Sequence, residues 1–363
     1  MKVIAMGYTG TGSSALVHLL KEYSNCYDVD TKNYEHNVLY VPHGIFDLED
    51  VLLNNNSLYR SDAALNDFYN EMKNLNDNDY NWFGGFQKRF GDEFMEAVTD
   101  FIDSLIIYSR DGGWSYDYRY RFKLVNVVKD IIKKLLGKEV DKFGYRIDTN
   151  GKDNLVKHAL PTDEEFYTAA NKFIDAYFKM VGYSEDKVYV FDQIIEPWQL
   201  ERIHNYFDED TRFIVFDRDP RDTFLSQKYV WSRTGNYSIM PTDVNLFIDF
   251  YSRLYRAEKY SDDNRILRIQ FEDLIYRYDE TVKIIENFIG AEKLGDHKLK
   301  KKFFIPEQSI KNTQLFTVNP KWRVEAEAIE NSELVNHIYD FPYESVTRID
   351  DITDPNPDTS IKE

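Results

Sequence analysis

The chain has 363 residues, a length that fits about two domains or one large α/β domain with an insertion. Hydrophobic residues make up 42% of it and charged residues 30%, with 27 Tyr and 25 Phe, which excludes a disordered or low-complexity protein. The formal net charge of −18 disfavours nucleic acid or an anionic membrane as a general partner, so any anion has to be bound at a local site.

The N-terminus and the cysteine content indicate a compartment. The first apolar run, residues 3–6, ends at Gly7 and is too short for the core of a signal peptide. No run approaches the ~20 apolar residues that a membrane span requires. The single cysteine, Cys26, excludes intrachain disulfides and Cys-based zinc sites and suits a reducing environment. These features predict a cytoplasmic protein without a transmembrane segment.

Short apolar runs followed by helical stretches recur along the chain. Such alternation predicts an α/β fold with a mainly parallel central sheet and helices on both faces. Pro220 suits the first turn of one of the helices. The expected strand and helix pairs are 3–6 with 14–21, 187–191 with 198–206, 213–216 with 223–231, and 265–269 with 279–288.

The pattern changes between about residues 57 and 183. This segment reads as amphipathic helices, such as 92–102 and 124–136, without convincing strands. Because the sheet needs strands from both sides of it, we interpret it as a helical insertion in a single domain over residues 1–349. The polar end, 350–363, is expected to be a frayed tail.

Residues 7–14 read Gly-Tyr-Thr-Gly-Thr-Gly-Ser-Ser, the spacing of a phosphate-binding loop, G-x-x-x-x-G-K-S/T, except that Ser13 stands at the lysine position. Glycines let backbone amides converge on a phosphate, and hydroxyl side chains add donors. Without the ammonium that reaches the β and γ phosphates of a nucleoside triphosphate, triphosphate chemistry is disfavoured while binding of a phosphate-like group remains. A tight turn that binds nothing is the alternative. The residues predicted to hold the anion are Gly7, Gly10, Thr11, Gly12, Ser13 and Ser14.

A second anion site is predicted where the third apolar run ends. Residues 218–226 read Arg-Asp-Pro-Arg-Asp-Thr-Phe-Leu-Ser. Arg218 can fold back over the following helix and share an anion with Ser226, because guanidinium presents a fork of donors to phosphate oxygens. The alternative is that Arg218 pairs with Asp219 or Asp222 and caps the helix.

These two motifs resemble those of the sulfotransferases that use 3′-phosphoadenosine 5′-phosphosulfate (PAPS). Residues 11–14 are similar to the last four positions of the family's first loop, R/K-S-G-T/S-T/S. Residues 218–226 match its second motif, R-D/N-P-R/K-D with a serine eight residues after the first arginine, at every position. Residues 270–290 and 321–323 look like its E-D-L … F-L-G stretch and its C-terminal W-K/R loop.

The resemblance covers residues 1–24 and about 187–325, and it implies a P-loop NTPase-like sulfotransferase fold. It also implies that the first loop holds the 5′-phosphosulfate of PAPS. PAPS carries anions at two ends of an adenosine, so two separated anion sites at one sheet edge suit it, whereas ATP has no 3′-phosphate. The other residues that the resemblance assigns to the nucleotide are Arg218 and Ser226 at the 3′-phosphate, and Trp322 and Arg323 over the nucleotide.

One position departs from the family. The residue before S-G-T/S-T/S is usually lysine or arginine there and stabilises charge on the bridging oxygen, but it is Gly10 here. Backbone donors of the loop, or a cation from elsewhere, have to supply that charge. The candidate cations are Lys311, Lys321 and Arg323.

Transfer to a hydroxyl needs a general base. Asp192, which follows the run 187–191, is the first candidate, and His43, Glu35 and His158 come after it. For each of the four, the alternative is an ordinary satisfied polar residue in a loop or a helix cap. No His, Cys and Asp spacing suggests a metal site, and sulfuryl transfer does not need one.

The sequence thus predicts a sulfotransferase that moves a sulfuryl group from PAPS to a hydroxyl of a carbohydrate or glycolipid acceptor by in-line transfer, releasing adenosine 3′,5′-bisphosphate. The acceptor class rests on aromatic and polar clusters at 80–83 and 116–121, which suit sugars and lipid-like groups but equally suit packing. Two alternatives stay open: a P-loop nucleoside or sugar kinase, and a catalytically inactive nucleotide-binding protein.

Overall fold

The computed structural model describes residues 1–28, 35–80, 83–111, 155–231, 239–258 and 262–345, with single helical positions at 128, 131, 132 and 135. It divides into two compact units, which we call the sheet unit (Met1–Asn37, Tyr80–Phe83 and Val181–Glu363) and the helical unit (Val38–Asp79 and Gly84–Met180). The predictions for 350–363, 116–121 and most of 124–136 lie outside the described residues. In the described parts of the chain, no helix combines the length and the apolar character that crossing a bilayer requires.

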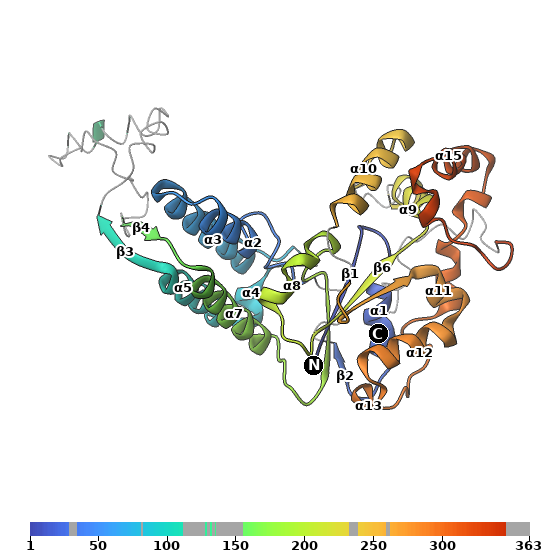
Figure 1. The fold of residues 1–363 in the computed structure, drawn as a ribbon, viewed down its shortest axis with the longest axis horizontal. Helices are drawn as coiled ribbons and strands as arrows, with labels where there is room; N and C mark the ends of the chain where they lie inside the picture. The colour runs from blue at the N-terminus through green and yellow to red at the C-terminus, as the bar shows by residue number, and fades with distance from the viewer. Residues whose placement is uncertain are drawn as a thin grey trace. The chain divides into compact units, whose positions relative to one another are not determined.

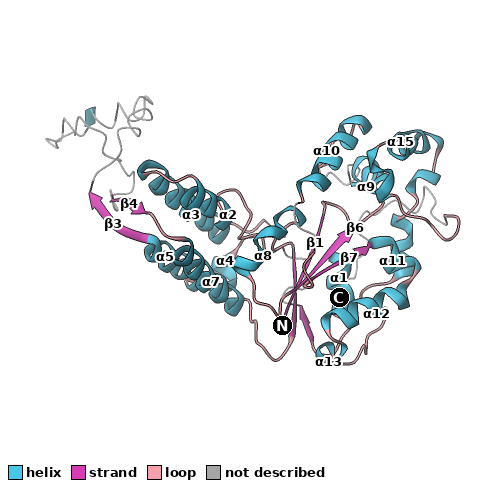
Figure 2. Ribbon diagram, viewed as in Figure 1, coloured by secondary structure: helices cyan, strands magenta, loops and turns pink. Residues whose placement is uncertain are grey.

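The sheet unit is built on a parallel sheet with the strand order β2-β5-β1-β6-β7. Figure 2 draws its strands β1, β6 and β7 as magenta arrows. In register, Ile4 lies between Phe191 on one neighbouring strand and Phe213 on the other. The four predicted strands are present. Those that form β1, β5 and β6 are short apolar runs that the sheet buries, whereas the one that forms β7, at the edge of the sheet, is partly exposed. The strand bounds are β1 (Lys2–Gly7), β2 (Cys26–Asp28), β5 (Val188–Asp192), β6 (Arg212–Asp217) and β7 (Ile266–Gln270).

One face of the sheet packs against three helices, α1 (Ser14–Leu20), α11 (Phe271–Tyr276) and α12 (Tyr278–Ile289). Val3 of β1 and Ile214 of β6 point into this core and are fully buried. Alternate residues of a strand face opposite sides of the sheet, so the residues next to Val3 and Ile214 in sequence point to the other face. That face must be covered by other parts of the chain.

The opposite face is covered as well. Ile4 and Phe213 are fully buried there. Phe207, which follows α8 (Ile203–Tyr206), packs on Phe213 with the ring centroids 5.3 Å apart. The predicted α/β class, with a mainly parallel sheet and helices on both faces, is therefore confirmed (Figure 1).

Two predicted helices of the sheet unit have mixed geometry. The stretch 198–206 forms a 3₁₀ helix, Pro197–Arg202, before α8. The stretch 223–231 belongs to α9 (Pro220–Leu225), which starts at the proline as predicted and continues as a π-helical turn, Ser226–Val230. The remaining helices are α10 (Val244–Ala257), α13 (Ala291–Leu294), α14 (Pro306–Ser309) and α15 (Pro320–Glu330), with 3₁₀ turns at Ile310–Asn312, Leu315–Thr317 and Glu333–His337.

The helical unit is held together by aromatic rings. Phe101 packs against Phe68 and Phe173, with centroid distances of 5.4 and 5.5 Å, and so joins three helices. The helices are α2 (Ile45–Glu49) with a π-helical turn at Asp50–Asn54, α3 (Leu58–Asp77), α4 (Phe86–Phe90), α5 (Glu93–Leu105) and α7 (Asp163–Met180).

The helical unit also contains strands, which the sequence analysis did not expect. β3 (Ile106–Asp111) and β4 (Leu155–Ala159) form an antiparallel pair. Ile107 and Tyr108 of β3 are both exposed, so the strand has no alternation of buried and exposed apolar residues by which it could be detected. The predicted boundaries, one domain over 1–349 with an insertion at about 57–183, remain a prediction.

Candidate functional site

The glycine loop connects β1 to α1 at the centre of the sheet. Gly10 and Gly12 have φ angles of +81° and +94°, which residues with a Cβ rarely adopt. A Cβ on Gly12 would lie 2.6 Å from a ring carbon of Phe271, and a Cβ on Gly10 would lie 2.7 Å from Nε2 of Gln227. The turn therefore requires glycine at both positions, for its backbone angles and for its lack of a side chain.

The hydroxyl groups of the loop have two kinds of environment. Ser14 Oγ donates to Asp192 Oδ2 at 2.8 Å, and Ser13 Oγ accepts from Gln193 Nε2 at 3.0 Å. Thr11 Oγ1 is buried and has no hydrogen-bond partner in the described part of the chain. Ser13 and Ser14 are thus tied to the end of β5, while the hydroxyl of Thr11 is left for a ligand.

Arg218 follows β6 and reaches the glycine loop. Its Nη1 donates to the carbonyl oxygen of Gly10 at 3.0 Å and to Ser226 Oγ at 3.4 Å, and its Nη2 donates to the carbonyl oxygen of Asn312 at 2.6 Å. The guanidinium carbon lies 5.5 Å from the ring centroid of Phe271. Arg218 and Ser226 are 6% and 5% exposed. The two motifs therefore lie side by side, joined by one buried guanidinium.

The aspartates of the second motif have other partners. Arg221 Nη2 donates to Asp219 at 2.6 Å, and its Nη1 donates to Glu330 at 2.6 Å. Asp219 caps α9 by accepting from the amide of Arg221 at 2.8 Å. The alternative in which Arg218 forms an ion pair with Asp219 or Asp222 and caps the helix does not match the hydrogen bonds of the described residues.

Asp222 connects α9 to a distant segment. It is fully buried and accepts hydrogen bonds from the amides of residues 314 and 315, both at 2.7 Å. Burial and the charge of Asp219 raise the pKa of Asp222, while the charge of Arg218 acts in the opposite direction. These bonds hold the segment whose Asn312 carbonyl accepts from Arg218.

Carboxylates from two segments meet where β5 ends. Glu35 and Asp192 form an isolated parallel bridge, and the amide of His36 donates to the carbonyl of Asp192 at 3.2 Å. Burial raises the pKa of Glu35 to about 7, and the charge of Asp192 adds to this shift. Burial, with the charge of Glu35, likewise raises the pKa of Glu196 to about 7. A carboxyl group with such a pKa exchanges protons at neutral pH, as a general base must.

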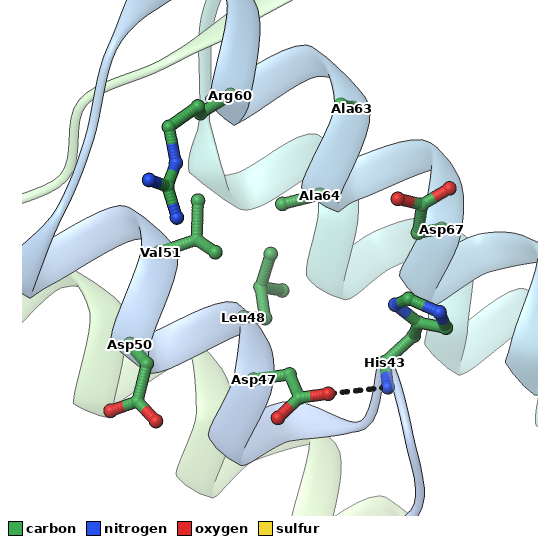
Figure 3. Close-up of a pocket in the computed structure, with 9 residues that line it drawn as sticks. All are labelled: His43, Asp47, Leu48, Asp50, Val51, Arg60, Ala63, Ala64 and Asp67. Carbon is green, nitrogen blue, oxygen red and sulfur yellow. Dashed lines mark hydrogen bonds between the residues drawn. The ribbon is translucent and has the colours of Figure 1, made fainter.

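The two candidate histidines belong to the helical unit. His43 is exposed, has a φ of +63°, and its amide donates to Asp47 at 2.6 Å. Figure 3 shows it at the edge of a cavity of about 360 Å³ whose walls come from α2 and α3. His158 is buried on β4 and stacks on Tyr108 with the centroids 4.3 Å apart. The structure thus brings together the two candidate bases of the sheet unit and assigns the histidines to the other unit.

Trp322 and Arg323 lie in the first turn of α15 rather than in a loop. Trp322 is buried and stacks on Tyr229, in the turn that begins at Ser226, with the centroids 4.9 Å apart. Arg323 donates to both carboxylate oxygens of Glu330 at 2.9 Å, and Lys321 Nζ lies 5.4 Å from the ring centroid of Tyr229. The helix α15 therefore lies against the segment that carries the motif serine.

Two residues of this sheet edge have no motif that points to them. Gln227 lies over Gly10 although nothing in its sequence position indicates a function. Glu196 comes shortly after β5 and directly before Pro197, a placement at a strand end that could have indicated it.

Comparison with known families finds a match for part of the chain. Residues 125–295, which include the motif from Arg218 to Ser226, match the model of a family described as the sulfotransferase family. The match covers 171 of the 363 residues. A sequence search finds no match among curated proteins. The α/β fold described above agrees with the sulfotransferase fold predicted from the motifs.

Three solved sulfotransferase structures are similar to this chain. A sulfotransferase from Alicyclobacillus acidocaldarius has 12% identity and a TM-score of 0.35, with 90% of each chain covered. A sulfotransferase domain from the curacin biosynthetic pathway has 11% identity and a TM-score of 0.30, covering 99% of this chain and 97% of that one. Sulfotransferase STF9 from Mycobacterium avium has 12% identity and a TM-score of 0.32, covering 91% and 74%. With TM-scores below 0.5, these likenesses establish nothing further about this chain.

Replacing Gly10 with alanine should destabilise the protein more than the same change at Gly182. Both glycines have positive φ, +81° and +88°, but nothing lies within 4 Å of a Cβ on Gly182, whereas Gln227 lies 2.7 Å from one on Gly10. We expect a loss of about 1 kcal/mol for Gly182→Ala and about 2 to 3 kcal/mol for Gly10→Ala. Urea unfolding measures both values, and equal losses would contradict the crowding at Gly10.

Glu35→Gln should change the pH dependence of stability. The pKa of Glu35 rises from an ordinary 4.5 to about 7 in the fold, so its contribution to stability is complete below pH 4.5 and is lost as the pH rises to about 7. Glutamine does not ionise, so the variant should match the wild type near pH 4.5 and exceed its stability by about 1 to 3 kcal/mol near pH 8. Thermal unfolding at both pH values tests this, with exposed Glu185→Gln as the control. An unchanged pH dependence would argue against the raised pKa.

Proposed function

We propose that this chain transfers a sulfuryl group from PAPS to a hydroxyl of a carbohydrate or glycolipid acceptor by in-line transfer. The hydrogen bond from Arg218 Nη1 to the carbonyl of Gly10 supports this most, because it brings the two predicted anion-binding motifs to one edge of the sheet. Open α/β sheets bind ligands at the carboxyl ends of their strands where the strand order reverses, which here is at β1 and its neighbours.

The polar groups at this edge fit a ligand with two anionic ends. Thr11 Oγ1 and Arg218 Nε are buried and have no hydrogen-bond partners among the described residues. Such groups are unfavourable unless a ligand satisfies them, and both donate to phosphate oxygens. In this proposal, the 5′ end is held by Gly7, Gly10, Thr11, Gly12, Ser13 and Ser14, the 3′-phosphate by Arg218 and Ser226, and the nucleotide is covered by Trp322 and Arg323.

In this proposal, three side chains and the loop amides carry out the sulfuryl transfer. PAPS supplies an activated sulfuryl group, whose transfer releases adenosine 3′,5′-bisphosphate. Glu35 takes the proton of the acceptor hydroxyl, because burial raises its pKa to about 7. Asp192 keeps that pKa high by its charge and is itself oriented by the hydroxyl of Ser14. Arg218 and the loop amides provide positive potential for the charge that develops on the leaving group.

The acceptor class rests on aromatic side chains beside polar groups. Tyr80 and Phe83 stack with the centroids 4.7 Å apart, and Tyr80 is 38% exposed. An exposed phenol ring offers an apolar face and a hydrogen-bonding edge, which suits sugar rings and glycolipid head groups. Labelled sulfate transfer from PAPS into panels of sugars and glycolipids would identify the acceptor.

Adenosine 3′,5′-bisphosphate should stabilise the protein more than AMP, ADP or ATP does. A ligand at a hundred times its Kd adds about 2.7 kcal/mol to the free energy of unfolding, enough for a clear thermal shift. Arg218→Ala should weaken binding of the bisphosphate by about 2 to 4 kcal/mol and change binding of adenosine 5′-phosphosulfate little.

Arg218→Lys serves as the matched variant, since it keeps the charge and loses the fork of donors. Circular dichroism of both variants checks the fold, because Arg218 also holds two carbonyl groups. Equal stabilisation by all four nucleotides would argue against PAPS as the donor. Equal losses for both ligands would argue against Arg218 at the 3′-phosphate.

Glu35→Gln should lower kcat by about a hundredfold or more and remove the acidic limb, with an apparent pKa of about 7, from the pH profile of kcat/KM. Asp192→Asn should instead move this limb to lower pH, because the charge that raises the pKa of Glu35 is gone. Glu185→Gln is the control. A Glu35→Gln enzyme that kept its acidic limb would assign the base to another residue.

A further inference from the structure

Gln227 carries a buried amide that the described protein leaves unsatisfied. The residue is 2% exposed and follows Ser226 in the π-helical turn after α9. Its Oε1 is buried and has no hydrogen-bond partner among the described residues. An unpaired amide in the interior is unfavourable, so a ligand that pairs with it would gain binding energy there.

The amide lies where a side chain of residue 10 would otherwise be. Nε2 of Gln227 is 2.7 Å from the position of a Cβ on Gly10, and the amide carbon is 3.7 Å from it. The peptide of Gly10 is held from the other direction by Arg218, whose Nη1 donates to its carbonyl at 3.0 Å. The amide of Gln227 is therefore fixed over the middle of the glycine loop.

Two other unsatisfied groups belong to residues in or in contact with the glycine loop. Thr11 Oγ1, next to Gly10, and Arg218 Nε, next to the carbonyl contact, are also more than nine-tenths buried and unpaired in the described structure. An amide, a hydroxyl and a guanidinium each donate hydrogen bonds, and the last has no accepting atom. A group with several oxygen acceptors and a negative charge accepts from the hydroxyl, from the guanidinium and from the NH2 of the amide, whereas the amide oxygen, itself an acceptor, takes no part in this contact.

We propose that Gln227 contacts the anionic group bound by the glycine loop, with Nε2 donating to one of its oxygens. The inference rests on the proposed function only for the identity of that group, which there is the 5′-phosphosulfate of PAPS. A neutral amide thus supplies a donor at the point where the loop has no side chain. The amide forms and breaks no covalent bond, and its role is to hold the oxygens of the group in place.

Gln227→Met separates the effect of losing the hydrogen bond to the ligand from the effect of losing packing. Methionine fills a similar volume without the unpaired amide, so the melting temperature should equal or exceed that of the wild type. The affinities for adenosine 5′-phosphosulfate and for adenosine 3′,5′-bisphosphate, measured by calorimetry, should both fall about ten- to a hundredfold. Gln227→Glu should weaken them further, because a carboxylate repels the anion. Gln308→Met, at an exposed position of α14, should change neither property.

The outcomes separate this inference from the proposed function. Full affinity of a folded Gln227→Met protein for both nucleotides would overturn the contact. Loss for the 3′-phosphorylated ligand alone would also overturn it, since that pattern belongs to Arg218. If the wild type binds neither nucleotide but binds inorganic sulfate or phosphate, and Gln227→Met loses that binding, the contact stands and PAPS as the donor fails. If the wild type binds neither the nucleotides nor these anions, both proposals fail.

Discussion

A buried guanidinium joins three segments of the sheet unit. Arg218 donates to the carbonyls of Gly10 and Asn312 and to the hydroxyl of Ser226. A charge that is only 6% exposed is tolerated in a protein interior when its hydrogens are bonded and its field is balanced. The carbonyls of Gly10 and Asn312 and the hydroxyl of Ser226 accept from Nη1 and Nη2, while Nε has no partner among the described residues. The shape of the candidate site therefore depends on this one cation, because Arg218 binds both the glycine loop, through Gly10, and the turn that contains Asn312.

The surrounding acidic residues explain how a chain with a net charge of −18 can hold an anion. Asp219, Asp222 and Glu272 are all 0% exposed. Burial raises the pKa of Asp222 and of Glu272, which means that their uncharged forms are favoured in the fold. The field near the loop is then less negative than the composition implies. Positive potential comes from Arg218 and from backbone amides, over a distance short enough that the rest of the surface matters little.

Four of the five strands of the sheet, and the glycine loop, could be predicted because their signals are local: short apolar runs that are followed by helical patterns. The short strand β2 was not predicted. The meeting of the two motifs also followed, since the carboxyl ends of parallel strands lie at one edge of a sheet. The pairing of Glu35 with Asp192 could not, because it joins segments far apart in sequence without a spacing rule. Burial of Gln227 depends on the turn that Arg218 holds in place, and glutamine is common on surfaces. β3 escaped detection because its apolar residues face solvent.

The amide over Gly10 restricts how such a loop can change in evolution. A side chain at residue 10 would meet the amide of Gln227, 2.7 Å from the position of its Cβ, and would be strained at a φ of +81°. Adding a side chain at residue 10 alone leads through an overpacked intermediate, which is unfavourable. Loops with lysine or arginine at position 10 and loops with glycine there are thus separated by a paired substitution rather than a single step. Two positions in separate motifs would therefore be inherited together, and the residue at 227 would reveal which kind of loop a relative carries.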